Sequence, residues 1–386
     1  MKPESAVKRL KRMLPGAIAI ALSAIAFAPG SAQASTASNT VIVNTATVNY
    51  NDAGNVAQTP VTATASVTVT LVPSAVLLSS PAATSTSQGQ NTILTYTVTD
   101  TANGPDTYNL SSVATPTNDS TVTPTFTSPI TLGGSTLAAA TVVGSTTITV
   151  PYDNVVSNAS INGLAPGNTI VIGGVAYLIA AGGISKNPGS NNATLTLTTP
   201  ITSVVAAGQI VGQQLTFTVT VPSGTITSGS SGSQSVSTTV TSTTAPNPAT
   251  TQGTPTVITV NRPTLTVAKT VSVNNGTSYG ASANAPPATV LIYQIVASNT
   301  GSTAATAVAF TDALPPYLTY VAASGRFATS AATGYAAATP LVDGAGGYTA
   351  TTAAGVTTVA YNPGSPGVGT VNGSSVLILF FQAKIN

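Results

Sequence analysis

The strictest constraint in this sequence is the period-two alternation of residues 40–72. In its second half, one side is apolar and consists of Val61, Ala63, Ala65, Val67, Val69 and Leu71. The residues between them are threonines and a serine. Successive side chains of a strand point to opposite faces, so this alternation predicts a half-buried β-strand.

The first half of the segment predicts a partner strand with the same kind of face. One side carries Ile42, Ala46, Val48 and Tyr50, and residues 51–54 (Asn-Asp-Ala-Gly) are typical of a turn. Residues 35–72 are therefore expected to form a β-hairpin with one apolar face. A hairpin is marginally stable alone, so we expect the six apolar residues of its second strand to form an assembly face.

Residues 1–34 have the pattern of a secretory signal peptide. A basic start containing Lys8, Arg9, Lys11 and Arg12 precedes the apolar residues 17–28, and Ala32-Gln33-Ala34 supplies small residues for cleavage. A retained membrane helix is the alternative. The pattern predicts a protein outside the cell or on its surface, with the periplasm as another compartment, and no membrane-spanning segment once the signal is removed.

The composition of the remaining chain favours a folded, all-β protein. Only 5 basic and 7 acidic residues remain, for a net charge of −2, so there is no basic surface for nucleic acid or anionic lipid. Hydrophobic residues make up 42% of the sequence, and abundant Val and Thr favour strands. Cysteine, histidine and tryptophan are absent. The expected partners are further copies of the chain or other surface proteins.

An internal repeat predicts two modules. "TILTYTVTDTANG" and "TVLIYQIVASNTG" align without a gap, which places Tyr96 on Tyr293 and Gly104 on Gly301. We predict a first β-sandwich module over residues 73–260 and a second over 261–386. Strands within residues 141–211, among them a tight hairpin at Gly173-Gly174, are interpreted as a small β-subdomain inserted into the first module.

Residues 291–321, "LIYQIVASNTGSTAATAVAFTDALPPYLTYV", resemble the conserved repeat domain of bacterial and archaeal surface proteins, the family called domain of unknown function eleven. The resemblance rests on Tyr293, the Asn-Thr-Gly turn at 299–301, Asp312, and Leu314-Pro315. It is weaker in the first module, and it implies immunoglobulin-like sandwiches. Copies in this family typically close with an Asn-Thr-Ala-Thr-Val-x-Tyr arm, which "NTATVNY" at 44–50 resembles. The first module has "VSTTVTSTTAP" in that place, and residues 261–386 have no copy.

The sequence offers little for catalysis, so we expect no enzyme and no cofactor. Without His or Cys, imidazole bases and the usual nucleophilic triads are unavailable. The carboxylate pairs Asp100–Asp106 and Asp119–Asp153 have no independent support. Asp100, Asn103 and Asp106 lie in one turn and form a candidate calcium site; the alternative is that these residues simply build the turn.

Lys269 lies on the alternating strand "TLTVAKTVSV" and is a candidate for a covalent crosslink. Some exported sandwich domains join a buried Lys to an Asn beside an acid, and in this chain Asp312 is the candidate acid. The alternative is an exposed lysine that blocks unwanted pairing at an edge strand.

These observations favour an exported structural protein of the cell surface or extracellular matrix. The first hypothesis is head-to-tail self-assembly, in which the N-terminal hairpin fills the second module of the next copy. In a close rival, the hairpin closes the second module of its own chain. Two further alternatives are an adhesin or ligand-binding protein that uses the inserted subdomain, and a passive surface or periplasmic stalk.

Overall fold

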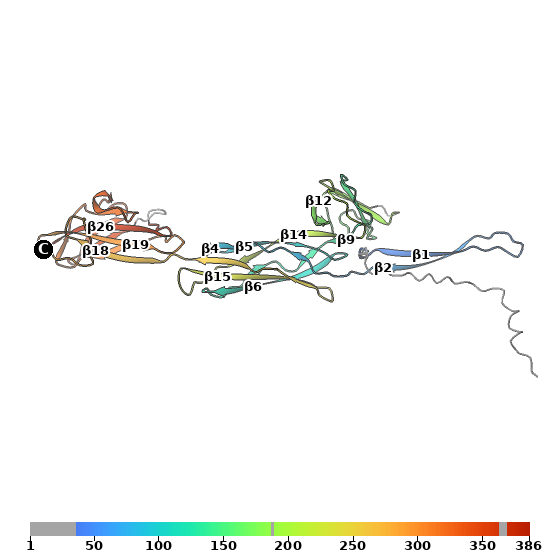
Figure 1. The fold of residues 1–386 in the computed structure, drawn as a ribbon, viewed down its shortest axis with the longest axis horizontal. Helices are drawn as coiled ribbons and strands as arrows, with labels where there is room; N and C mark the ends of the chain where they lie inside the picture. The colour runs from blue at the N-terminus through green and yellow to red at the C-terminus, as the bar shows by residue number, and fades with distance from the viewer. Residues whose placement is uncertain (1–35, 187–188, 363–368) are drawn as a thin grey trace, which may run out of the picture. The chain divides into compact units, whose positions relative to one another are not determined.

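The computed structural model describes residues 36–186, 189–362 and 369–386. The predicted signal peptide lies outside these residues. The predicted all-β fold is confirmed, since the regular structure described is strand apart from the short 3-10 turn η2 (Tyr335–Ala337) (Figure 1). Among the described residues, no helix is long and apolar enough to cross a membrane.

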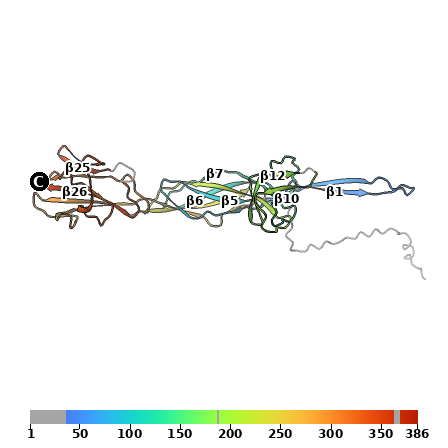
Figure 2. The ribbon, with the colours of Figure 1, turned by 90° about the horizontal axis from the view of Figure 1, so that it is seen from above.

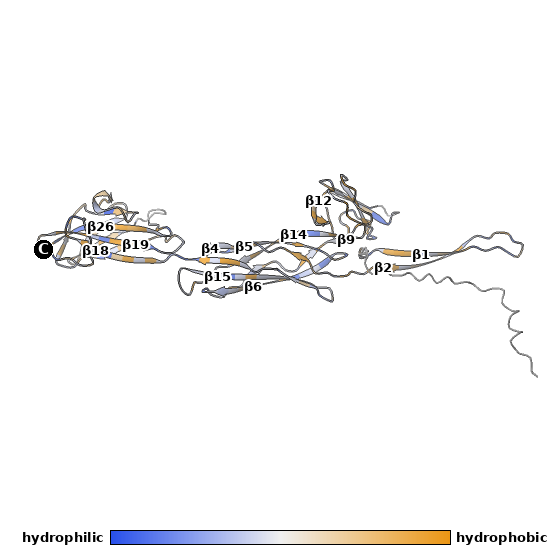
Figure 3. Ribbon diagram, viewed as in Figure 1, coloured by the Kyte–Doolittle hydropathy of each residue, from blue (hydrophilic) through white to orange (hydrophobic). Residues whose placement is uncertain are grey.

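The N-terminal hairpin consists of β1 (Val41–Val48) and β2 (Val61–Thr68), which form a separate two-stranded antiparallel sheet. The register pairs Ile42 with Val67 and Val48 with Val61, so these apolar residues of the two strands share one face, whereas Val41 and Val43 lie on the other. Every residue of both strands is exposed. Figure 3 shows the apolar residues along this ribbon in orange.

The first module, residues 73–261, has two facing sheets (Figure 1). One sheet is centred on β5 (Thr92–Thr99) and β14 (Ile210–Val221), and the other on β6 (Asp106–Thr117) and β15 (Ser231–Ser242). Buried side chains between them, including Val98, Tyr108 and Val240, form the core. The remaining strands are β3 (Leu77–Leu78), β4 (Thr84–Ser87), β7 (Thr125–Phe126), β8 (Ile130–Leu132), β9 (Gly134–Thr136), β16 (Ala249–Thr251) and β17 (Thr256–Asn261).

The inserted strands extend the first of these sheets. Figure 2 shows two of them, β10 and β12, at one end of β5 and β6. They are β10 (Thr147–Pro151), β11 (Thr169–Ile172), β12 (Val175–Lys186) and β13 (Asn192–Leu197). β11 pairs with β14, and β11 and β12 meet at Gly173-Gly174, where both residues have positive φ, as a two-residue turn of this kind requires. These strands contribute most of a hydrophobic cluster of their own, centred on residues such as Ile170, Tyr177 and Leu195.

The second module, residues 263–386, also packs two sheets together. The larger sheet has the order β18 (Leu265–Ser272), β19 (Val290–Asn299), β26 (Ser375–Ile385), β22 (Arg326–Ala328) and β23 (Thr339–Pro340), with β21 (Leu318–Tyr320) paired to β26. The smaller has the order β20 (Phe310–Ala313), β25 (Val356–Tyr361) and β24 (Tyr348–Ala353). Ile295 and Leu379 of the first pack with Phe310 and Tyr361 of the second.

The repeated tyrosine makes the same cross-strand contact in both modules. Tyr96 pairs with Phe217 and stacks on it at 5.2 Å, and Tyr293 pairs with Phe381 and stacks at 5.4 Å. β5 therefore corresponds to β19, and β14 to β26. This correspondence allows positions in one module to be compared with positions in the other.

Candidate functional site

The base of the N-terminal hairpin is fixed to the first module by Asn103. Its side-chain amide donates to the carbonyl oxygens of Thr36 (2.9 Å) and Thr70 (3.3 Å), and its side-chain oxygen accepts from the backbone N–H of Val72 (2.7 Å). The backbone N–H of Ser38 also donates to the carbonyl of Asn103. One buried side chain thus holds both ends of the hairpin.

Gly104 is required for this contact. A Cβ at Gly104 would overlap the side chain of Ser38, which is itself buried. Gly301 is its counterpart in the second repeat. The backbone of Pro263 and Thr264 passes directly over it, and a Cβ at Gly301 would meet that backbone. The glycine shared by the two repeats therefore lets an incoming segment of chain pass directly over each module.

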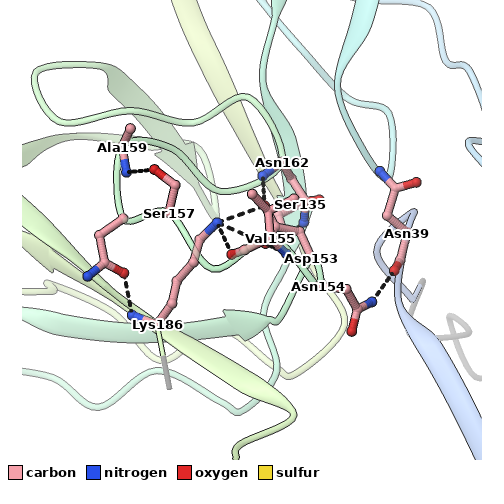
Figure 4. A network of polar contacts seen from close by, with 10 residues as sticks. Asn39, Ser135, Asp153, Asn154, Val155, Ser157, Ala159, Asn162 and Lys186 are labelled. Atoms are coloured by element: carbon pink, nitrogen blue, oxygen red, sulfur yellow. Dashed lines mark hydrogen bonds and ion pairs between the residues drawn. The ribbon is translucent and has the colours of Figure 1, made fainter. Parts of the chain in front are cut away.

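The inserted strands reach the hairpin base through a buried ion pair (Figure 4). The Lys186 ammonium lies 2.8 Å from Asp153, and its side chain is 0% exposed. It also donates to the carbonyl of Val155 at 3.0 Å. Asn154, which follows Asp153 in the chain, donates from its side chain to the carbonyl oxygen of Asn39 at 2.9 Å. No sequence pattern predicted this pair, because Lys186 ends an apolar strand and Asp153 is distant in the chain.

Asp119 and Asp153, which the sequence offered as a carboxylate pair without independent support, bind different partners. Asp119 accepts a hydrogen bond from Gln234 at 2.8 Å, whereas Asp153 binds Lys186. Among the residues that the structure describes, no three His, Cys, Asp or Glu side chains gather as a metal site.

The calcium candidates Asp100, Asn103 and Asp106 are all buried in the turn between β5 and β6. Asp106 accepts from Ser242 (2.6 Å) and Thr244 (2.9 Å), and Asn103 holds the hairpin. Asp100 Oδ1 accepts from the Tyr108 hydroxyl at 2.7 Å, but its Oδ2 has no hydrogen-bond partner among the described residues. The turn brings the three residues together while their side chains serve different partners, so calcium binding stays a prediction.

Burial changes the acid chemistry of this turn. Desolvation, with the nearby charge of Asp106, raises the pKa of Asp100 to about 7. Burial and the neighbouring Asp100 also raise the pKa of Tyr108. A carboxyl group kept partly neutral in this way is a structural group sensitive to pH rather than a general base facing solvent.

The apolar face of the hairpin is uncovered over most of its length. Val67 is 66% exposed and Ile42 is 52% exposed. Of the six residues predicted for this face, Val61, Ala63, Ala65 and Val67 are exposed, while Val69 and Leu71 are half-buried near the base.

The second module has an uncovered surface on the core side of β18. Leu78 pairs with Val98 in the first module, and Lys269 pairs with Ile295, the counterpart of Val98. Val76, two residues before Leu78, therefore corresponds to Val267. Val76 is 3% exposed, whereas Val267 is 69% exposed.

The difference arises from strands that cover Val76. It packs in a cluster with Val240 of β15, and Thr250 of β16 donates to its carbonyl at 2.7 Å. Within the described part of residues 263–386, no strand corresponds to β15, β16 or β17. In the smaller sheet of this part, β20 is the edge strand and pairs only with β25. The second module thus presents an open edge, which consists of β20 together with the core side of β18.

The predicted pair Lys269 and Asp312 lies at this open edge. The Lys269 ammonium is 2.8 Å from Asp312 Oδ1 and lies 4.9 Å from the ring centre of Tyr293. The Lys269 side chain is 44% exposed, while Asp312 is 8% exposed. The structure brings the two residues together, with one side of the lysine open to solvent.

Comparison with known proteins finds no matching family model and no matching curated protein. Among solved structures, the C-terminal domain of the AgI/II polypeptide BspA of Streptococcus agalactiae is 12% identical, with a TM-score of 0.26, and the match covers 80% of this chain and 86% of that one. The C-terminal domain of the antigen I/II-family protein AspA of Streptococcus pyogenes is 11% identical, with a TM-score of 0.28 and coverages of 90% and 91%.

Proposed function

We propose that this protein is a self-assembling structural subunit of the cell surface or extracellular matrix. In the assembly, the N-terminal hairpin of one copy occupies the open edge of the second module of the next copy. There it takes the place that β15 and β17 take in the first module. The observation that carries the proposal is the contrast between buried Val76 and exposed Val267.

The two surfaces complement each other chemically. The hairpin offers an apolar face with exposed residues such as Ile42 and Val67. The open edge offers exposed Leu265 and Val267 beside β20, which pairs with β25 on one side only. Burying the exposed apolar side chains of the hairpin face, such as Ile42, Val61 and Val67, is worth about 5 to 10 kcal/mol before ordering costs. Pairing with β20 would also satisfy an edge that otherwise invites nonspecific association.

The positions of the attachment points in the first module favour a contact between copies. The hairpin base is held by Asn103, next to the end of β15 where Ser242 pairs with Tyr108. The connection to the second module leaves at Asn261, which pairs with Ser231 at the other end of β15. The 12 residues of β15 separate these ends by roughly 35 Å at the usual strand rise. A hairpin donated forward from one end would make a heterologous, non-closing contact, which gives filaments.

The resemblance of residues 291–321 to the repeat domain of surface proteins supports the proposed location. The leader-like pattern in residues 1–34 supports export. Both belong to the same proposal, in which the chain acts outside the cell.

A matched pair of substitutions in β2 tests the hairpin's role. Val67→Asp places a charge on the apolar face, and Ser66→Asp places the same charge one residue away on the opposite face. Both residues are exposed, so we expect neither change to alter the unfolding free energy by more than about 0.5 kcal/mol. Val67→Asp should abolish polymer in sedimentation velocity, because docking would bury an unpaired charge.

The Ser66→Asp variant should still form polymer of normal length. Equal behaviour of the two variants, whether both polymerise or both stay monomeric, would contradict a role for the apolar face.

A further inference from the structure

The Lys269–Asp312 pair occupies a position that is purely apolar in the first module. There the counterpart of Lys269 is Leu78. Leu78 packs against a cluster that contains Ala114 of β6 and Val236 of β15, and these two residues are direct partners in the β6–β15 register. Asp312 faces inward from β20 and contacts Lys269, much as Ala114 faces inward from β6 into the cluster that Leu78 packs against. In the first module a third residue, Val236 of β15, completes this contact. The described part of the second module has no residue in the place of Val236.

The hairpin supplies that third residue in the proposed assembly. "NTATV" at 44–48 aligns without a gap with "VSTTV" at 236–240, so Val48 falls on Val240 and Asn44 falls on Val236. Val236 and Val240 are both buried on the core side of β15. Asn44 likewise shares the apolar face of β1 with Val48, and it is exposed in the single copy. Docking would thus place the Asn44 amide against Lys269 and Asp312.

We propose that Lys269 of one copy and Asn44 of the next form a covalent isopeptide bond, with Asp312 as the proton-transfer group. This inference rests on the proposed function, because the three groups meet only when the hairpin docks. In the first module the corresponding cluster holds the apolar residues Leu78, Ala114 and Val236, so no crosslink is expected there.

The reaction needs no oxidant and no additional reactant. Docking removes Lys269 and Asp312 from water, which disfavours the two charges and favours transfer of a proton from the ammonium to the carboxylate. The neutral amine then attacks Cγ of Asn44, which the protonated Asp312 polarises. A new bond forms between Lys269 Nζ and Asn44 Cγ, and the bond from Cγ to Nδ2 breaks. The Nζ proton passes through Asp312 to the leaving nitrogen, which departs as ammonia.

The test uses the mature full chain and three variants, Lys269→Arg, Asp312→Ala and Asn44→Ala. The wild-type polymer should give a ladder of covalent multimers after boiling in SDS. Trypsin should no longer cleave after Lys269, and the joined peptides should weigh less than their sum by one ammonia. Lys269→Arg keeps the positive charge but removes the amine, so it should polymerise and yet dissolve entirely to monomer in SDS.

Each outcome separates this proposal from the proposed function. Wild-type polymer that dissolves to monomer in SDS, with an unmodified Lys269 peptide, overturns the crosslink and leaves assembly standing. A loss of ammonia within a single chain, without a ladder, overturns the contact between copies. Absence of any wild-type polymer overturns the proposed function, and this proposal with it. A ladder that persists in Asn44→Ala would assign the bond to another residue and contradict the alignment.

Discussion

Single residues in this protein have structural roles that their chemistry alone would not predict. Asp100 is 1% exposed, and its pKa is raised to about 7 because it is buried. Its ordinary value is 3.8, so the folded state holds a proton that the unfolded state releases between these two pH values. Asp100 therefore contributes most stability below about pH 4, and this contribution is lost as the pH rises through about 7.

Replacing Asp100 with Asn should remove this pH dependence. The wild-type unfolding free energy is expected to fall by about 3 to 4 kcal/mol between pH 4 and pH 8 through this group alone. Asp100→Asn should flatten that fall when urea unfolding is followed at both pH values. Asp52→Asn is a matched control, since Asp52 lies in the exposed hairpin turn. An unchanged pH slope in Asp100→Asn would show that Asp100 is ionised throughout.

At the scale of elements, the predicted hairpin shows what alternation can and cannot establish. The period-two pattern predicted the hairpin and its apolar face, because strand geometry alone decides which side chains share a face. It did not reveal that Asn103, one of the calcium candidates, holds the hairpin base. Turn residues such as Asn and Asp serve many partners, and the choice among them depends on which chain segments meet in three dimensions.

The buried Lys186–Asp153 pair is a second feature that the sequence did not predict. The partners lie 33 residues apart and meet only because β12 folds back beside the segment that follows β10. By contrast, Lys269 and Asp312 were singled out from the sequence, and the structure places them in contact. The two residues were chosen by analogy with exported sandwich domains that join a Lys to an Asn beside an acid, since spacing alone carries no such information. The crosslink itself stays a prediction.

Asn103→Ala should loosen the hairpin without unfolding the module. The substitution removes the hydrogen bonds that the buried Asn103 side chain makes to the backbone of Thr36, Thr70 and Val72. We expect a loss of about 1 to 3 kcal/mol, and faster amide hydrogen exchange in residues 69–72. Asn109→Ala, an exposed position on β6, is the control. Unchanged exchange at the hairpin base would contradict the role assigned to Asn103.

At the scale of the whole molecule, assembly depends on two surfaces that the single chain leaves uncovered. The first module contains strands that cover Val76, and the second module leaves the corresponding Val267 exposed. The hairpin is a two-stranded sheet that pairs with no other strand among the described residues. A protein with one donor and one acceptor surface assembles without limit if the two surfaces belong to different copies.

Mixing two defective variants tests this claim most directly. Val67→Asp places a charge on the apolar face of the hairpin and leaves the open edge unchanged. Val267→Asp places a charge on the open edge and leaves the hairpin unchanged. Each variant alone should sediment as a monomer. Mixed in equal amounts, they should form a one-to-one heterodimer that grows no further, because the complex has no intact donor or acceptor left. If the mixture stays monomeric while wild-type protein polymerises, or if either variant alone forms filaments, the hairpin and the open edge are not the contact.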